Sequence, residues 1–436
     1  MFEAPSAPLP VDLVRFVVAL SAALETANEA MANHQARTAL IAIALAKRLG
    51  LNPDRIRDIF FAAILHDVGA LSPEEKHELH SGLASYIERH TRVGEELLGS
   101  LPYFERASKI VGLHHTSWLL ATDKVAGDLC LDGSILALSD TVERSIDRRG
   151  FILHQDRAIV AAIAKGSGSA FSKEVTSAFL DLSSCDAFWL DLSLPHAFPA
   201  IEGMLPFGRF EIPREALLEV SVFVRSLIDF RSRFTATHSS GVSAAARELG
   251  RTMGFDPSAL RDLEVAGNMH DIGKMSVGDD ILLKPSGLDA SEFARMRQHS
   301  YHSYHFIRAS GIGHNVAAWA GYHHERLDGL GYPFRHGNDA LDLGARILAV
   351  TDVSTALAEN RPYRVGLDRE TTLGVVRGMA ARGSLDAEVV AALVASYDDV
   401  VGAAMLAQSK AAERYEEEVR CGLSAESNRR TERTRS

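Results

Sequence analysis

The sequence predicts an all-α protein built from two tandem helical domains that are related by internal duplication. Three observations lead to this prediction. Apolar residues recur at helical spacing, strand-like alternation with turn dipeptides is scarce, and the two halves of the 436-residue chain repeat the same polar positions in the same order. The length allows two to four domains of about 100–200 residues each. With 46% hydrophobic and 24% charged residues, the composition is that of an ordinary globular protein.

Charge and cysteine content exclude several classes of protein. The formal net charge is -11, from 46 Lys+Arg against 57 Asp+Glu, which is unfavourable for binding DNA independently of sequence. The three cysteines form no CxxC, so we expect neither a disulfide framework nor a cysteine metal site. The longest early apolar run, residues 16–24, is far short of the roughly 20 residues that span a membrane. We therefore expect a cytoplasmic protein with no membrane insertion and no DNA partner.

The repeat organises the whole chain. Residues 49–58 match residues 253–262 at an offset of 204, and the offset drifts to 209 and then 212, as insertions in loops produce. The spacings of 32 and 24 residues between histidines are the same in both halves. Seven pairs of polar residues match in order: His34 and His238, His66 and His270, Asp67 and Asp271, His90 and His299, His114 and His323, His115 and His324, Asp140 and Asp352. We interpret this as a duplication.

Helix-start signals place these positions on helices and suggest domain boundaries. Asn52 and Asp256 can each cap a helix whose first residue is a proline. We predict a first domain over residues 1–160 and a connector over residues 161–211, where prolines interrupt the pattern. A second domain would cover residues 212–407, and residues 408–436 would form a charged, partly disordered tail. For the tail, a terminal helix that continues to Val419 is the alternative.

Five histidines and two aspartates in each half indicate a metal site. Neutral imidazoles and carboxylates suit iron, manganese or zinc, and seven donors approach what two octahedral ions need. An aspartate that directly follows a histidine can bridge two ions, and paired ions clamp the attacking and leaving oxygens of a phosphoryl transfer. A lone histidine is usually capped or solvated, which is our interpretation of His154, His302, His305, His314 and His336. Ten histidines that repeat in register do not fit that interpretation.

The second half resembles a known family over about residues 212–405. His238, His270-Asp271 and Asp352 are arranged as in the HD superfamily of metal-dependent phosphohydrolases. Residues 323–333, which read His-His-Glu-Arg-Leu-Asp-Gly-Leu-Gly-Tyr-Pro, resemble the hallmark of its HD-GYP branch, as do residues 345–352 and 360–364. The resemblance implies a cytoplasmic bacterial phosphodiesterase that hydrolyses a cyclic dinucleotide, chiefly cyclic di-GMP, with iron or manganese.

The resemblance also implies roles for single residues. Asp271 would bridge the metals, and Lys274 would contact the scissile phosphate, which makes these two the catalytic residues. The ring of Tyr332 would lie against a guanine. The implied metal ligands are His238, His270, Asp271, His299, His323, His324 and Asp352. The implied substrate contacts are Lys274, Gly331, Tyr332, Pro333, Arg361 and Arg364.

Two departures from the family pattern limit this transfer. Some members carry a glutamate four residues before the first histidine, where it supports a third metal. Phe234 and Ala30 stand at that position here, so we expect two metals in the second domain. The family often has an aspartate three residues after the last ligand, where this chain has Thr355, which affects expected substrate contacts but not the metals.

The first half resembles the HD superfamily as well, but it lacks the substrate contacts. Its candidate metal ligands are His34, His66, Asp67, His90, His114, His115 and Asp140. Ala70 stands where the second half has Lys274, and residues 116–120 replace the start of the Gly-Tyr-Pro loop. We therefore expect a degenerate, regulatory domain that can bind metal. Chains with two HD-type domains occur among HD-GYP enzymes that act on 3′,3′-cyclic GMP-AMP, which makes that dinucleotide the alternative substrate.

Three functions compete at this point. The leading one is hydrolysis of cyclic di-GMP to a linear dinucleotide, with GMP as a further product. A non-catalytic cyclic dinucleotide receptor is a second class, and the intact ligands with Lys274 argue against it. A general HD nucleotidase or dNTP hydrolase is the third, and residues 325–333 disfavour it. The sequence leaves a homodimer open.

Overall fold

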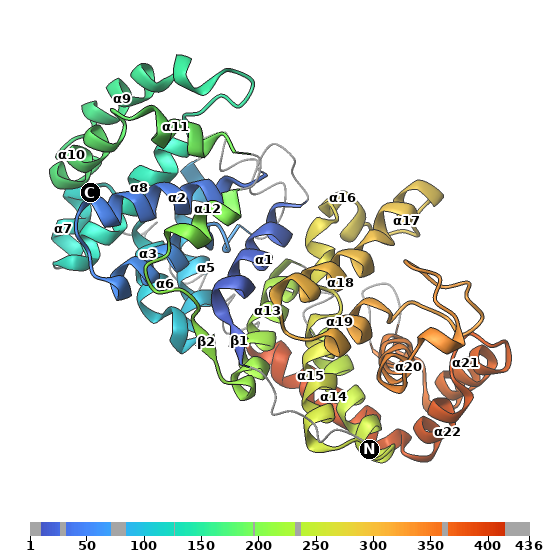
Figure 1. The fold of residues 1–436 in the computed structure, drawn as a ribbon. Coiled ribbons are helices and arrows are strands. Elements are labelled where there is room, and N and C mark those ends of the chain that lie inside the picture. The colour runs from blue at the N-terminus through green and yellow to red at the C-terminus, as the bar shows by residue number, and fades with distance from the viewer. Residues whose placement is uncertain are drawn as a thin grey trace, which may run out of the picture. The chain divides into compact units, whose positions relative to one another are not determined.

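The computed structural model describes residues 10–26, 32–70, 84–125, 127–194, 197–231, 237–359 and 365–414. These residues are mostly helical, and the strands among them are β1 (Val11–Asp12) and β2 (Glu211–Ile212), which pair with each other (Figure 1). The prediction of an all-α fold is confirmed. The chain divides into two compact units: a first unit, Asp12–Ile212, and a second unit, Pro213–Ser436 together with Met1–Val11.

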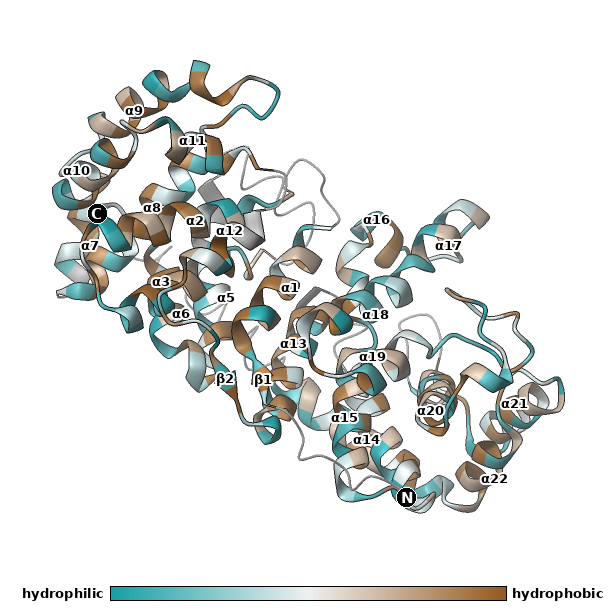
Figure 2. Ribbon diagram, in the orientation of Figure 1, coloured by the Kyte–Doolittle hydropathy of each residue, from teal (hydrophilic) through white to brown (hydrophobic). Residues whose placement is uncertain are grey.

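The first unit is a bundle built around α2, which packs against α3 and α8, while α5 packs against α6. Hydrophobic residues run along α1 and α8 (Figure 2), and Phe16 and Leu136 there are fully buried. The predicted cap at Asn52 is present, since its side chain accepts from Arg55 N at 2.9 Å. Its helices are α1 (Leu13–Glu25), α2 (His34–Arg48), α3 (Pro53–Ile64), α5 (Ala84–Gly99), α6 (Glu105–Leu113), α7 (Trp118–Lys124), α8 (Asp128–Arg144), α9 (Asp156–Lys165), α10 (Lys173–Leu182), α11 (Asp186–Leu192) and α12 (Ala197–Met204).

Residues 161–211 are part of this unit and do not form the separate connector that their prolines suggested. Helix α10 packs on α2 and α8, and α12 packs on α2. Phe179 and Trp189 are fully buried, and the Trp189 indole N–H donates to Ser183 O at 3.0 Å. Pro199 lies in the first turn of α12, where a missing N–H costs no helical hydrogen bond. The compact unit therefore extends to Ile212 instead of ending at residue 160.

The second unit repeats this arrangement. Helix α14 packs against α15 and α20, while α18 packs against α19 and the 3₁₀ turn Ile272–Ser276. The predicted cap at Asp256 is present, since its carboxylate accepts from Ser258 N and Ala259 N. The helices are α13 (Leu217–Arg231), α14 (His238–Thr252), α15 (Pro257–Met269), α16 (Asp279–Leu282), α17 (Ala290–Met296), α18 (Gln298–Ser310), α19 (His314–Gly321), α20 (Leu343–Ala358), α21 (Arg369–Ala381) and α22 (Ala387–Ala395), followed by Tyr397–Arg414.

The last of these helices changes the expected boundary of the tail. It continues to Arg414, past the predicted end of the second domain at residue 407. The rest of the predicted tail, including Val419, lies outside the described residues. Among the described residues no single helix is long and apolar enough to cross a membrane. The pair Ala387–Ala395 and Tyr397–Arg414 meets that test only when joined across an 81° bend.

Candidate metal centres

The seven predicted ligands of the second unit lie at or near helix ends, except Asp352, which lies within a helix. His238 is the first residue of α14, His270 caps the end of α15 and is followed by Asp271, and Asp352 lies within α20. His299 is the second residue of α18, and His323-His324 follow the end of α19. All but His324 are buried. The structure brings all seven together; that they bind metal stays a prediction.

The seven side chains form two groups of three that Asp271 joins. One group is His238, His270 and Asp352, and the other is His299, His323 and His324; within each group the donor atoms lie within 4.8 Å of one another. The two oxygens of Asp271 point to different groups: Oδ2 lies 3.3 Å from His270 Nε2, and Oδ1 lies 3.5 Å from His299 Nε2. This is the arrangement of a carboxylate that bridges two cations.

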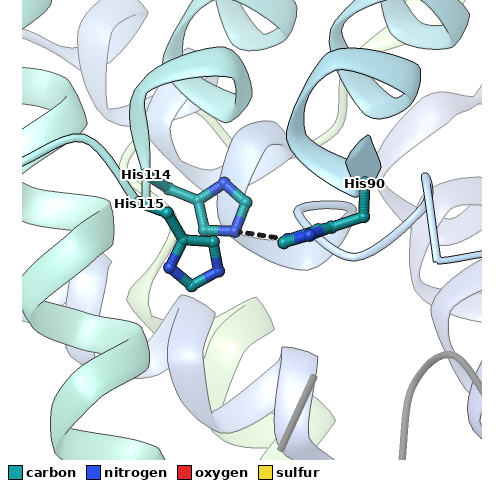
Figure 3. Close-up of side chains that lie close together, drawn as sticks. All are labelled: His90, His114 and His115. Carbon is teal, nitrogen blue, oxygen red and sulfur yellow. Dashed lines mark hydrogen bonds between the residues drawn. The ribbon is translucent and has the colours of Figure 1, made fainter. Parts of the chain in front are cut away.

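The first unit has a similar pattern, except that Asp67, and not the match of Asp352, completes its first group. His34, His66 and Asp67 form one group, and His90, His114 and His115 form another, with donor atoms again within 4.8 Å in each group. Figure 3 shows the three rings of the second of these groups facing one another, with His90 Nε2 and His114 Nε2 3.2 Å apart. Asp67 Oδ2 lies 3.4 Å from His66 Nε2, and Asp67 Oδ1 lies 3.8 Å from His90 Nε2. Asp140 Oδ1 lies 3.4 Å from His34 Nε2.

Backbone carbonyls orient most of the buried histidine rings. In the second unit, Nδ1 of His270 is 2.7 Å from Gly267 O, and Nδ1 of His299 is 2.7 Å from Met296 O. His323 contacts Ala320 O in the same way, as do His66 and His114 in the first unit with Ala63 O and Val111 O. Since a carbonyl can only accept, Nδ1 must carry the proton. The lone pair of Nε2 then faces the centre, as a metal ligand requires.

Carboxylates that the sequence did not reveal orient the first histidine of each set. Nδ1 of His238 lies 3.0 Å from Glu359 Oε2. In the first unit the partner of His34 Nδ1 is Glu143, which also accepts from Arg37 Nε at 2.8 Å and Arg148 Nη2 at 2.5 Å. The two glutamates do not match in the repeat, because Glu143 follows Asp140 by three residues and Glu359 follows Asp352 by seven. Glu143 lies on α8 one turn after Asp140, so helical spacing was an available signal for it, whereas Glu359 is the extended residue that follows the end of α20 and had no such signal.

The electrostatic environment keeps most of these groups in the forms that bind a cation. Burial lowers the pKa of His299 to about 3 and that of His115 to about 4, so both imidazoles are neutral at neutral pH. Burial alone would raise the pKa of Asp271, but His270 and Lys274 outweigh it and hold that pKa well below the usual range.

The first histidine of each set is an exception. Burial alone would lower its pKa, but Glu359 and Asp352 raise the pKa of His238 to about 10, and Glu143 and Asp67 raise that of His34. Once such a histidine gives up its proton, each group offers neutral imidazole and ionised carboxylate donors, which fit divalent first-row cations.

A glycine after each His-Asp pair lets the third ligand approach. A Cβ on Gly273 would lie 1.9 Å from His299 O, and one on Gly69 would lie 2.1 Å from His90 O. The backbone that carries the His-Asp pair therefore runs directly against the helix that carries the next histidine. The residue that follows differs between the units: Lys274 extends its Nζ to 2.6 Å from Asp271 Oδ2, whereas Ala70 is buried and carries no charge.

In the second unit the loop after His323-His324 folds back over the site. Buried Glu325 accepts from the backbone N–H groups of Phe334, Arg335 and His336 at 2.7, 3.1 and 3.0 Å. Tyr332 N donates to His324 O at 3.2 Å, and its ring centroid lies 4.8 Å from that of His324. A Cβ on Gly331 would lie 2.5 Å from Arg326 N, so this close return needs glycine. The predicted substrate contacts Arg361 and Arg364 lie outside the described residues, as do Phe234 and Ala30.

Comparison with known proteins identifies both units. A family model described as an HD domain matches residues 223–389, and a second model of the same description matches residues 31–145. The chain contains two HD domains. We call them the first HD domain, in the first unit, and the second HD domain, in the second unit.

Curated relatives cover the two HD domains unequally. The chain is 27% identical over 402 residues to 3′3′-cGAMP-specific phosphodiesterase 1 of Vibrio cholerae, a match that spans 88% of this chain and 91% of the relative. It is 36% identical over 166 residues to cyclic di-GMP phosphodiesterase PA4108 of Pseudomonas aeruginosa, which covers 37% of this chain and 39% of that protein. A crystal structure of a cyclic GMP-AMP specific phosphodiesterase from V. cholerae matches with a TM-score of 0.62 at 18% identity over 89% of this chain and 98% of that one, which supports the tandem fold.

The first HD domain uses the segment after its histidine pair differently. Trp118 N donates to Ala170 O at 2.9 Å and Leu119 N donates to Ser169 O at 3.3 Å. This segment therefore continues into α7 and is tied to the turn before α10, whereas the second HD domain returns a loop to its metal site. Arg144 is a cation near a ligand carboxylate of this domain, with its Nη1 3.5 Å from Asp140 Oδ2. In the first HD domain, the described residues offer metal donors without a counterpart of Lys274 or Tyr332.

Proposed function

We propose that the second HD domain is a metal-dependent phosphodiesterase that hydrolyses a 3′,5′-cyclic dinucleotide to its linear form. The observation that carries this proposal is the geometry around Asp271. Its carboxylate stands between two groups of histidine and aspartate donors, with Lys274 2.6 Å away and the Tyr332 loop beside His324. These are the parts that opening a phosphodiester beside a flat base requires.

Two divalent cations would supply positive charge to the attacking and leaving oxygens of the phosphate. The donors suit first-row metals, and the family resemblance implies iron or manganese. The residues of the chain perform the remaining tasks. His238, His270 and Asp352 would hold one cation, His299, His323 and His324 would hold the other, and Asp271 stands between the two groups. The Lys274 ammonium, with a side chain that is 18% exposed, stabilises negative charge that develops on the phosphate. The ring of Tyr332 offers a flat apolar surface to a base.

The relatives suggest which dinucleotide to test first. The relative that aligns along both HD domains carries a name that specifies 3′3′-cGAMP, while those named for cyclic di-GMP align with less than half of this chain. This favours the mixed dinucleotide over cyclic di-GMP, the leading substrate from sequence. Both stay within the proposal, as do a cytoplasmic location and a regulatory first HD domain.

A turnover assay with measured metal content tests the proposed function. The full chain, loaded with Mn²⁺ or Fe²⁺, is incubated with 3′,3′-cyclic GMP-AMP, cyclic di-GMP, cyclic di-AMP and a dNTP. We expect a linear dinucleotide from at least one of the first two and no dNTP hydrolysis. Binding of a cyclic dinucleotide without turnover by metal-replete protein would make the chain a receptor, and hydrolysis of the dNTP alone would make it a nucleotidase.

A further inference from the structure

Helix α17 and the residue after it place an aromatic ring and a guanidinium at the outer edge of the Tyr332 loop. Phe293 is 46% exposed, so much of its ring is open to solvent or to a ligand. Its ring centroid lies 6.1 Å from that of Tyr332 at an interplanar angle of 84°, and Arg297 Cζ lies 5.6 Å from the Phe293 ring centroid. Since Tyr332 in turn lies against His324, the three rings His324, Tyr332 and Phe293 lead from the metal centre outward.

This edge is held rigidly and is coupled to the metal ligands. Asp289 and Glu292 form a capping box at the start of α17, and Lys284 Nζ donates to both Glu292 oxygens at 2.7 and 2.6 Å. At the other end, Met296 O accepts from His299 Nδ1 at 2.7 Å, so the helix that carries Phe293 also orients a predicted ligand. The ring of Phe293 is therefore set at a fixed place relative to the site although much of it faces solvent.

We propose that Phe293 and Arg297 form an outer clamp for the second base and phosphate of a cyclic dinucleotide. The inference rests on the proposed function. A cyclic dinucleotide places a second base and a second phosphate beside the one being cleaved, so one set of contacts at Tyr332 and Lys274 leaves half of the molecule unheld. An exposed phenylalanine face stacks with any base, and an arginine stacks on the base or forks to a phosphate. Both residues position the substrate and do not touch the reacting atoms.

The other half of the repeat supports the assignment. At the offset of 209 that matches His90 with His299, the first HD domain has Ala84 in place of Phe293 and Glu88 in place of Arg297. An alanine cannot stack with a base, and a glutamate would repel a phosphate. The chain thus lacks this pair in the same half where Ala70 replaces Lys274.

Steady-state kinetics of Phe293→Ala and Arg297→Gln in the full metal-loaded chain test the clamp. Two substrates are compared: the cyclic dinucleotide that the unchanged chain turns over best, and bis(p-nitrophenyl) phosphate, which has one phosphate and no base. We expect each variant to raise KM for the dinucleotide about 10-fold with kcat changed less than about threefold, and to leave bis(p-nitrophenyl) phosphate turnover unchanged. Phe293→Trp should keep the normal KM. Arg295→Gln, at an exposed arginine of the same helix, is the matched control and should behave as the unchanged chain does.

Each other outcome contradicts a defined claim. Normal KM values in both variants would overturn the clamp while the proposed function stands. An equal loss with both substrates, or a loss of bound metal, would show that α17 acts only by supporting His299. If the unchanged chain turns over bis(p-nitrophenyl) phosphate but no cyclic dinucleotide, the proposed function fails and the clamp with it.

Discussion

The two HD domains hold nearly the same donor geometry in different surroundings. Both have two groups of three donors, and both need a glycine where the His-Asp pair meets the next histidine. Asp271 stands between the two groups of the second HD domain, whereas Asp67 is itself a member of the first group of the first HD domain. They differ in what surrounds this framework. The second has Lys274, a returning loop with Tyr332, and the exposed pair on α17, whereas the first has Ala70 and a segment that leads away into α7. The comparison separates holding metal from positioning a substrate, and positioning supplies much of a rate enhancement.

The outer contacts of the first histidine differ too. Burial alone would raise the pKa of Glu143, but His34, Arg148 and Arg37 outweigh it and lower that pKa to about 2. Glu359 in the second HD domain contacts His238 Nδ1 at 3.0 Å and accepts from Gln408 Nε2 at 3.2 Å. The carboxylate that orients the first histidine of the first HD domain thus also accepts from two arginines, Arg37 and Arg148.

Among the positions where the two HD domains carry different side chains, we expect the largest loss of turnover at Lys274. Lys274→Ala should lower turnover about 10²–10³-fold, because one charge that stabilises the transition state is lost. Metal content, measured by elemental analysis, should not change. Lys109→Ala, at an exposed lysine of the first HD domain, is the control and should have no effect. A variant that loses its metals but keeps its rate per bound metal would show that Lys274 supports the metal site instead.

The outer carboxylates should affect metal affinity independently in the two domains. Glu359→Gln should weaken metal binding by the second HD domain about 10–100-fold, and Glu143→Gln should do the same in the first, since each orients a ligand histidine. Only Glu359→Gln should then reduce turnover at limiting Mn²⁺, and excess Mn²⁺ should restore it. Metal titration followed by calorimetry and by activity distinguishes the two. Equal loss of activity in both variants would mean that the domains share one functional site.

The smallest expected effect concerns the aromatic ring near each histidine pair. Tyr332→Leu should raise KM for the dinucleotide about 10-fold, because a stacking surface for a base is lost. Trp118→Ala, which removes the nearest aromatic residue after His114-His115, should leave KM within error. Initial rates over a range of substrate concentrations provide the comparison. A raised KM in the Trp118 variant would place substrate at the first HD domain.

The sequence predicts the fold class and the grouping of the candidate ligand side chains, because both depend on spacing that the duplication preserves. His238 and Asp352 are 114 residues apart, yet their side chains meet at 3.0 Å, as the resemblance implies. Partners that depend on helix packing could not be predicted in this way. Glu143 and Glu359 occupy unmatched positions, and the role of Glu325 as acceptor for three backbone N–H groups becomes visible only when the loop is folded.

Prolines in the sequence do not mark the end of the first compact unit. Residues 161–211 carry prolines, but Phe179 and Trp189 are fully buried in the first unit. Burial of large apolar side chains decides which unit a segment joins, and proline at a helix start does not oppose it. The first HD domain therefore needs residues up to Ile212 for its core.

We expect both HD domains to hold metal but only the second to catalyse hydrolysis. The most direct test measures turnover and metal content of Asp271→Ala and Asp67→Ala side by side in the full chain. Each variant should lose metal from its own domain only. We expect Asp271→Ala to lower cyclic dinucleotide hydrolysis at least about 10³-fold, and Asp67→Ala to leave it within about threefold. Hydrolysis that persists in Asp271→Ala and disappears when Asp67→Ala is added would contradict the account and place catalysis in the first HD domain.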